Sequence, residues 1–318
     1  MTAPAAVGGQ RPQWEHLPQH VRQAIATLLG AEVLSAVSQP GGFTPGFASR
    51  IELADGRRAF VKAGHASQNE QVPKAYAREA RIVSQLPSEV ACARLLAQAV
   101  AEDGWQLVAF EDVEGRNPAL PWTHDDLGRV LEAMTVLADS LSPSPIEGQQ
   151  ISDTMADEFS LWSQALEITT LAQLEQVSPW CAAHLEQLCD LEPHWREAAR
   201  GQSLQHFDLR ADNIILAKDR VVFVDWTHAG LGAAWVDLLG MLPSVLMHGG
   251  HDAEQIVTSH PLTRSVEPGA ITAVLSALTS YFVIGSFRPA PEGLPTVRAF
   301  QRAQGVAAAE WLARRMDN

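Results

Sequence analysis

The stretch Leu204–Trp226, LQHFDLRADNIILAKDRVVFVDW, decides the fold because it carries three oxygen-bearing side chains at short, ordered spacing. Asp208, Asn213 and Asp225 are separated by five and then twelve residues. The apolar runs IIL and VVFV flank a polar turn, Lys218–Arg220, and predict a β-hairpin. Asn213 precedes one strand and Asp225 ends its partner. We therefore expect their oxygens to meet at one edge of the hairpin and form a metal site.

Oxygen ligands in this number are typical of Mg²⁺, which takes one or two carboxylates alongside substrate phosphates. Asp208 has the spacing to Asn213 found in the H-R-D-x-x-x-x-N loop, whose aspartate accepts the proton of an attacking hydroxyl. The pattern predicts phosphoryl transfer, with Asp208 as base and with Asn213 and Asp225 as metal ligands. We expect Asp212 to be solvated.

This stretch resembles the aminoglycoside phosphotransferases and related small-molecule kinases, whose catalytic loop reads H-G-D-x-x-x-x-N and is followed by I-D-W or I-D-F. Phe207 stands where that family usually has glycine, and we expect the change to affect packing and pocket shape more than chemistry. A later segment, Gly232–Leu238, resembles the family's G-x-x-x-x-D-L-A. The resemblance implies that Asp237 braces the catalytic loop and that His206 supports it structurally.

The resemblance also implies a fold. It is an α+β, two-lobed protein-kinase-like fold, with a small N-terminal lobe made of an antiparallel sheet and a helix. The larger C-terminal lobe would be mostly helical. We place the nucleotide-binding lobe at residues 1–112 and the catalytic, acceptor-binding lobe at residues 113–318.

The first third of the chain should then supply a lysine on a strand and an acidic partner on a following helix. Lys62 follows an apolar run, the context of the lysine that contacts the α- and β-phosphates. Asp55-Gly56 is a hairpin signal that makes this the third strand of a meander. Apolar residues at helical spacing predict a helix from Val72 to Leu86, on which Glu79 is the best partner for Lys62. Glu70 is the fallback.

A flexible phosphate cover is predicted at Ser38–Ser49, where Gly41 and Gly42 would let the backbone approach the phosphates closely. The match to G-x-G-x-x-G is poor, and no Walker A lysine follows. An ordinary Gly/Pro-rich hairpin loop is the alternative.

A strand and an acidic turn at Trp105–Gly115 correspond to the family's hinge between lobes. The resemblance implies that the nucleotide base lies against Phe110, Glu111, Asp112 and Val113. The alternative for this segment is a solvated connector.

Helical periodicity predicts helices over 125–141, 153–176, 181–200, 234–246 and 297–316, the first of them capped at Thr123. In related antibiotic kinases, acids on such helices line the acceptor pocket, which suggests Asp153, Asp157 and Glu158 here. The alternative is an exposed acidic first turn that favours the helix dipole.

Composition indicates a folded protein of 318 residues with 46% hydrophobic content. No apolar run approaches the roughly 18 residues that span a bilayer, and the N-terminus lacks a secretory pattern. Three cysteines without metal-ligand spacing, Cys92, Cys181 and Cys189, fit a reducing cytoplasm. A net charge of −14 argues against nucleic acid and anionic membrane, and favours a cationic acceptor.

The sequence as a whole predicts an enzyme that uses ATP, or another nucleoside triphosphate, and Mg²⁺ to phosphorylate a hydroxyl of a small molecule. An aminoglycoside, another antibiotic, an amino sugar and a metabolite alcohol all remain open as acceptor, because specificity depends on local pocket contacts. A nucleotide-binding pseudokinase with a regulatory role is the alternative from another class. A protein kinase is disfavoured, because the eleven residues between Asp225 and Asp237 leave no room for an activation loop.

Overall fold

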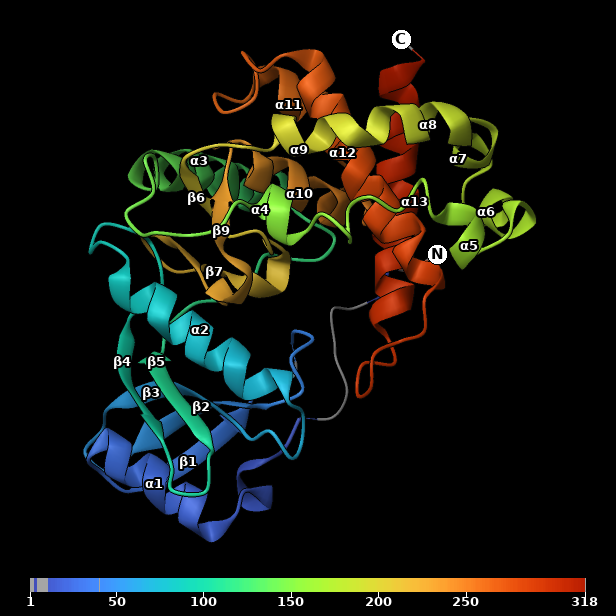
Figure 1. The fold of residues 1–318 in the computed structure, drawn as a ribbon. Coiled ribbons are helices and arrows are strands. Elements are labelled where there is room, and N and C mark those ends of the chain that lie inside the picture. The colour runs from blue at the N-terminus through green and yellow to red at the C-terminus, as the bar shows by residue number, and fades with distance from the viewer. Residues whose placement is uncertain (1–2, 5–10, 40, 318) are drawn as a thin grey trace.

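The computed structural model of the chain describes residues 3–4, 11–39 and 41–317. A five-stranded antiparallel sheet occupies the N-terminal part, and most of the remaining chain is helical (Figure 1). The predicted α+β composition is therefore confirmed.

The sheet has the strand order β1-β2-β3-β5-β4. Its strands are β1 (Val33–Ser38), β2 (Phe47–Leu53), β3 (Arg58–Gly64), β4 (Leu95–Val100) and β5 (Gln106–Glu111). Gly56, at φ +83°, turns the chain between β2 and β3, where glycine has no steric penalty. The predicted meander is confirmed, although β2 begins at Phe47, earlier than expected.

Two longer helices pack against this sheet. The first helix, α1 (Gln19–Leu29), follows the short turn η1 (Trp14–His16) and buries Val21, Ile25 and Leu29 in the sheet's core. The second, α2 (Gln71–Gln85), lies between the sheet and the helical part (Figure 1). Tyr76, Ala80 and Val83 on α2 join the core of the helical part. This position lets α2 present a side chain to the cleft between the two parts.

The helical part begins with α3 (His124–Ser140), where the Thr123 hydroxyl accepts a hydrogen bond from the Asp126 amide and confirms the predicted cap. The remaining α-helices are α4 (Ile151–Thr154), α5 (Ala165–Ile168), α6 (Leu171–Val177), α7 (Pro179–Ala183), α8 (Leu185–Leu191), α9 (Trp195–Ala198), α10 (Val236–Leu246), α11 (Ala253–Ser259), α12 (Pro268–Val283) and α13 (Val297–Met316). The other 3-10 turns are η2 (Glu192–His194), η3 (Ala211–Asn213), η4 (Trp226–His228) and η5 (Gly285–Phe287).

The two continuous helices predicted over 153–176 and 181–200 were wrong, because this region breaks into short helices α4 to α9. The predicted helix over 153–176 is interrupted by a residue that lies outside it, Glu192. The buried carboxylate of Glu192 accepts hydrogen bonds from the amides of Trp162 and Ser163, at 2.6 and 3.4 Å. These amides would otherwise bond within a helix.

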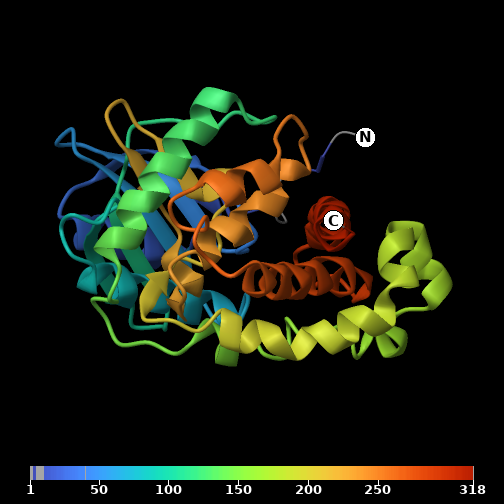
Figure 2. The same cartoon turned by 90° about the horizontal axis from the view of Figure 1, so that it is seen from above.

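A buried pair of helices, α12 and α13, forms much of the core on this side, and Figure 2 shows α13 end-on beside α12. Pro268–Phe287 has a mean hydropathy of 1.7, enough by length and composition to cross a membrane, which corrects the expectation that no run approaches this length. Because 78% of the window is buried inside the protein, the segment has the surroundings of a core helix.

Two small antiparallel pairs lie between the sheet and the helices. They are β6 (Ser203–Gln205) with β9 (Gly230–Gly232), and β7 (Ile214–Leu216) with β8 (Val221–Phe223). Ile214 pairs with Phe223, so the hairpin predicted from the opening stretch is confirmed. This register places Asn213 and Asp225 at the same hairpin edge.

Candidate active site

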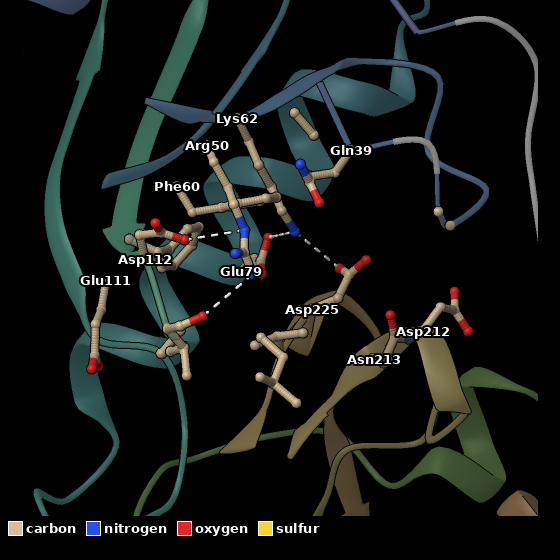
Figure 3. A pocket seen from close by; sticks show the side chains of 18 of the residues that line it. Gln39, Arg50, Phe60, Lys62, Glu79, Glu111, Asp112, Asp212, Asn213 and Asp225 are labelled. Atoms are coloured by element: carbon tan, nitrogen blue, oxygen red, sulfur yellow. Dashed lines mark hydrogen bonds and ion pairs between the residues drawn. The ribbon is translucent and has the colours of Figure 1, made fainter. Parts of the chain in front are cut away.

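A buried ion pair joins the sheet to α2. Lys62 Nζ lies 2.7 Å from Glu79 Oε2 and 3.4 Å from Asp225 Oδ1, which brings three separate segments together (Figure 3). Burial disfavours the ammonium ion, but Asp225 and Glu79 outweigh it and raise the pKa of Lys62. Burial also raises the pKa of Glu79 to about 7 against the opposing effect of Lys62. The 2.7 Å contact between Lys62 and Glu79 favours the state in which both groups are charged. Glu70, the fallback, instead pairs with exposed Lys74.

A second contact fixes α2 relative to the hairpin. The Arg78 guanidinium donates hydrogen bonds to the carbonyls of Thr227 and Ala229, both at 2.9 Å. Glu79 is the next residue on the helix, so this contact keeps its carboxylate near Lys62 and Asp225.

The hairpin edge presents two hard oxygen donors to the cleft. Figure 3 shows Asn213 and Asp225 side by side below Lys62. Burial alone would raise the pKa of Asp225, but Lys62 and the Thr227 hydroxyl hold it below its ordinary value, so the carboxylate is ionised. No group of three or more His, Cys, Asp or Glu forms a metal cage among the described residues. One carboxylate and one amide oxygen fit Mg²⁺, which relies on waters and substrate phosphates for the rest.

Asp208 lies between this edge and the helical part. Asn213 Nδ2 donates to its carboxylate at 3.0 Å and to its backbone carbonyl at 2.8 Å. Arg210 Nη1 donates to the other carboxylate oxygen. Burial raises the pKa of Asp208, and Arg210 and His228 oppose that effect. The predicted base and metal ligand are therefore in direct contact.

The loop that carries Asp208 is held from below by Asp237. Its carboxylate accepts hydrogen bonds from the amides of His206, at 2.7 Å, and Phe207, at 2.8 Å. His206 Nε2 lies 2.8 Å from the Val224 carbonyl, and its Nδ1 accepts from the Asp208 amide at 3.3 Å. These contacts require a neutral imidazole, and burial lowers the pKa of His206 to about 4. The structure thus places Asp237 and His206 where bracing was predicted.

The glycine-containing loop covers the cleft as a β1–β2 connection. Gly41 and Gly42 line a cavity of about 380 Å³ together with Lys62, Glu79, Asn213 and Asp225. The guanidinium of Arg11 donates to the carbonyls of Gly41 and Gly46, at 2.5 and 3.5 Å. Residue 40, within the predicted loop, lies outside the described residues.

All four predicted hinge residues, Phe110 to Val113, line the same cavity. The acids there are engaged by arginines. Asp112, 2% exposed, lies 2.5 Å from Arg58 and 3.2 Å from Arg50, and Glu111 lies 2.7 Å from Arg220. The segment is therefore an ordered wall of the cleft, which does not fit a solvated connector.

The predicted acceptor acids lie elsewhere. Asp153 pairs with Arg196 and Arg200 at the surface, Glu158 pairs with Arg288, and Asp157 is exposed. None of the three lines either cavity of the site. The predicted helix ends early, because α4 stops at Thr154. In the segment that follows, the buried side chain is that of Phe159 and not those of the acids.

Sequence reasoning missed Arg210 and Arg11, and it misplaced Asp212. The side chain of Asp212 is only 17% exposed and binds Arg210 through both oxygens, at 3.1 and 3.0 Å. A cation two residues from the base could have signalled Arg210. No sequence signal links Arg11 to a loop thirty residues later.

The two-part fold and this cleft define a kinase-like phosphotransferase. The sequence model of the phosphotransferase enzyme family (APH) matches residues 46–258, two thirds of the chain. The protein belongs to this family, and it is a small-molecule kinase. No curated protein matches it in sequence.

Solved structures share its fold at low identity. A thermostable mutant of the aminoglycoside phosphotransferase APH(4)-Ia, in a ternary complex with ADP and hygromycin B, has a TM-score of 0.61 and 12% identity, covering 94% of this chain and 100% of that one. An aminoglycoside phosphotransferase from Alicyclobacillus acidocaldarius has 0.62 and 14%, covering 97% of both. The choline kinase LicA from Streptococcus pneumoniae has 0.57 and 17%, covering 93% and 98%. These likenesses confirm the protein-kinase-like fold.

Proposed function

We propose that this chain transfers the γ-phosphoryl group of ATP to a hydroxyl of a small molecule. One observation carries the proposal. Lys62, Glu79, Asn213 and Asp225, from four separate segments, line one cleft, and Asp208 touches its edge through Asn213. Chance burial would not collect these polar groups around a cavity of about 380 Å³.

Each residue has a role that its surroundings support. Lys62 holds the α- and β-phosphates, and Glu79 fixes its ammonium group. Gly41 and Gly42 cover the phosphates, and the hinge segment from Phe110 to Val113 holds the base. Because the transition state is loose, positioning and charge neutralisation account for most of the acceleration.

Asn213 and Asp225 would hold Mg²⁺, which neutralises charge on the nucleotide phosphates when bound. Asp208 orients the acceptor hydroxyl and accepts its proton. In this division of labour, residues 1–112 bind the nucleotide, while residues 113–318 carry the base, the metal ligands and the acceptor site.

Similar structures support the donor and the kind of acceptor. APH(4)-Ia was crystallised with ADP or AMP-PNP and hygromycin B, and another neighbour with ADP and spectinomycin. A cationic acceptor was expected from the net charge of −14, but the predicted acceptor acids lie outside the site. Three free cysteines, two of them buried, suit the proposed cytoplasmic location.

The test is incubation of the purified protein with ATP, Mg²⁺ and a mixed library of hydroxyl compounds. We expect mass spectrometry to detect a compound that gains one phosphoryl group, and GTP in place of ATP reports donor preference. Nucleotide binding without any product across a broad panel would favour the pseudokinase alternative. Absence of nucleotide binding would refute the proposal.

A further inference from the structure

A second cavity, of about 160 Å³, lies on the acceptor side of Asp208. It is lined by the catalytic loop, by the segment after α4, by α10, α12 and α13, and by the tip of the glycine-containing loop. It shares no lining residue with the nucleotide cleft, and the contact between Asp208 and Asn213 joins the two. An acceptor bound here therefore has its hydroxyl next to the proposed base.

The cavity is small. A cavity of about 150 Å³ with apolar walls holds one benzene molecule. The cavity beside Asp208, at about 160 Å³, therefore has room for one six-membered ring and a short substituent. A multi-ring aminoglycoside would extend beyond its walls.

Six of its eighteen lining residues are Phe or Tyr. Phe207 and Tyr281 both contact Phe159, with ring centroids 5.6 and 5.3 Å apart. Phe43, also on the lining, contacts Phe300, with ring centroids 5.3 Å apart. Such walls bind a flat or apolar ring through stacking and burial.

Both carboxylates that line the cavity already have partners, so neither is free to pair with a cationic acceptor. Its acidic residues are Asp208 and Asp237, and Asp237 is already bonded to two backbone amides. Asp208 is bonded to Arg210, whose guanidinium also lies over the Phe43 and Phe300 rings. A polyamine acceptor would bury ammonium groups without partners, which is costly.

The cavity does offer one amide. Gln304 lines it and is 3% exposed. A side-chain amide carries both donors and an acceptor, so one that lines a cavity can bind a polar atom of a ligand.

Phe207 forms its wall from a strained backbone. Its φ of +63° lies in the left-handed region, where a bulky residue is a rare outlier and glycine has no penalty. Such strain persists where the surroundings over-determine it, often at ligand sites. The same residue contributes its ring to the cavity wall.

We propose that the cavity beside Asp208 binds the acceptor, and that the acceptor is an uncharged hydroxyl compound built on one ring, selected by Phe207 and bonded by Gln304. This rests on the proposed kinase function. In the reaction the acceptor oxygen forms a bond to the γ-phosphorus while the bond from that phosphorus to the β,γ-bridging oxygen breaks. ADP leaves, and the hydroxyl proton passes to Asp208.

The experiment uses the full chain with defined probes. Benzyl alcohol, 2-phenylethanol and 1-phenyl-1,2-ethanediol represent uncharged single-ring acceptors, and choline and hygromycin B represent cationic ones. Binding of each probe is measured by ligand-observed NMR in the presence of Mg-ADP, and phosphorylation is measured by mass spectrometry with Mg-ATP. Calorimetry with Mg-ADP alone tests the nucleotide site separately.

We expect at least one uncharged probe to bind and to be phosphorylated in preference to the cationic ones. Phe207→Gly should raise KM for that probe about tenfold, near the upper end of the loss expected when an aromatic contact is removed. Phe207→Tyr, which retains the ring, should keep KM within about threefold of wild type, a difference of less than 1 kcal/mol. Gln304→Leu should also raise KM, while Gln255→Leu, at an exposed site on α11, should not.

Preferential phosphorylation of choline or hygromycin B would overturn the inference. So would Mg-ADP binding with no binding of any uncharged probe, an outcome that leaves the kinase proposal intact. If Phe207→Gly changes thermal stability but not KM, the ring is only a packing element and the specificity role fails. If the wild-type protein does not bind Mg-ADP, the kinase proposal is refuted. Binding of the probes would then still show whether the cavity accepts uncharged single-ring compounds.

Discussion

Asn213 donates a hydrogen bond from its side-chain amide to the carboxylate of Asp208 at 3.0 Å, so the proposed metal ligand orients the proposed base. The same amide nitrogen also binds the Asp208 carbonyl at 2.8 Å. These two hydrogen bonds close the turn between Asp208 and Asn213, which are five residues apart. The loop that carries Asp208 is therefore closed by its own hydrogen bonds.

Replacement of Asp208 by Asn should leave the loop folded but abolish its basicity. We expect turnover to fall at least about a hundredfold, the lower range of acid-base contributions, while Mg-ADP binding is retained. Steady-state kinetics and calorimetry measure the two effects. Asp219→Asn, in the exposed turn of the same hairpin, is the matched control and should retain activity. Unchanged turnover in Asp208→Asn would remove the residue from its role.

Replacement of Lys62 should reduce nucleotide affinity and stability, whereas replacement of Asp208 should reduce turnover. Lys62→Met removes the phosphate contact and leaves the buried carboxylate of Glu79 and the partly exposed one of Asp225 without their cation. Mg-ADP affinity should fall by roughly 10- to 100-fold, since a hydrogen bond to a charged group contributes about 1.5–3 kcal/mol. Thermal stability should fall as well, because an unpaired buried charge is costly.

Lys74→Met is the control for this pair. Lys74 lies on the same helix as Glu79, but its ion pair with Glu70 is exposed, and such pairs contribute at most about 1 kcal/mol. Affinity measured by calorimetry should be unchanged. Equal losses in the two variants would mean that Lys62 has no special contact with nucleotide.

The catalytic centre could be predicted from sequence because its residues follow an ordered motif. Asp208, Asn213 and Asp225 lie at fixed spacing around a hairpin whose strands are apparent from their apolar runs. Helical periodicity then distinguished Glu79 from Glu70. Local patterns suffice where the neighbours that fix a residue are close in sequence.

The rest depends on contacts that no local pattern contains. Glu192 bonds amides some thirty residues upstream, and this disrupts the expected helix that carries Asp153. Arg11 reaches the glycine-containing loop across a similar distance. The left-handed backbone of Phe207 follows from its tertiary surroundings, since the residue type itself disfavours that conformation.

Two glycines predict opposite effects of the same substitution. At Gly64, at the end of β3, an added Cβ would overlap the Val72 side chain on α2. Gly64→Ala should therefore push α2 away from the sheet and destabilise the protein by about 1–3 kcal/mol, the usual cost of overpacking. Because Glu79 lies on α2, activity should fall too.

At Gly128, inside α3, an added Cβ meets nothing within 4 Å. Gly128→Ala should stabilise the protein by up to about 1 kcal/mol, because alanine is the better helix former. Urea unfolding measures both variants. Equal effects would show that the tight approach of α2 to β3 is absent in solution.

The buried imidazole of His206 predicts how stability depends on pH. Burial lowers its pKa in the folded protein from 6.5 to about 4. Between these values the unfolded chain binds a proton that the folded chain does not, so stability falls as pH falls. The contribution of His206 is fully present above about pH 6.5, and the loss reaches at most about 3 kcal/mol near pH 4, at roughly 1.4 kcal/mol per pKa unit.

His206→Gln isolates this contribution, because Gln cannot titrate. Asp237, whose pKa burial raises to about 6, acts with the opposite sign, but it is present in both proteins and largely cancels in their difference. The free energy of unfolding, measured in urea from pH 7.5 to 4.5, should favour the wild type most at high pH. The two curves should converge as pH falls. Parallel curves over this range would mean that His206 is not held neutral, and the contact of its Nε2–H with the Val224 carbonyl would then not be what orders the loop at Asp208.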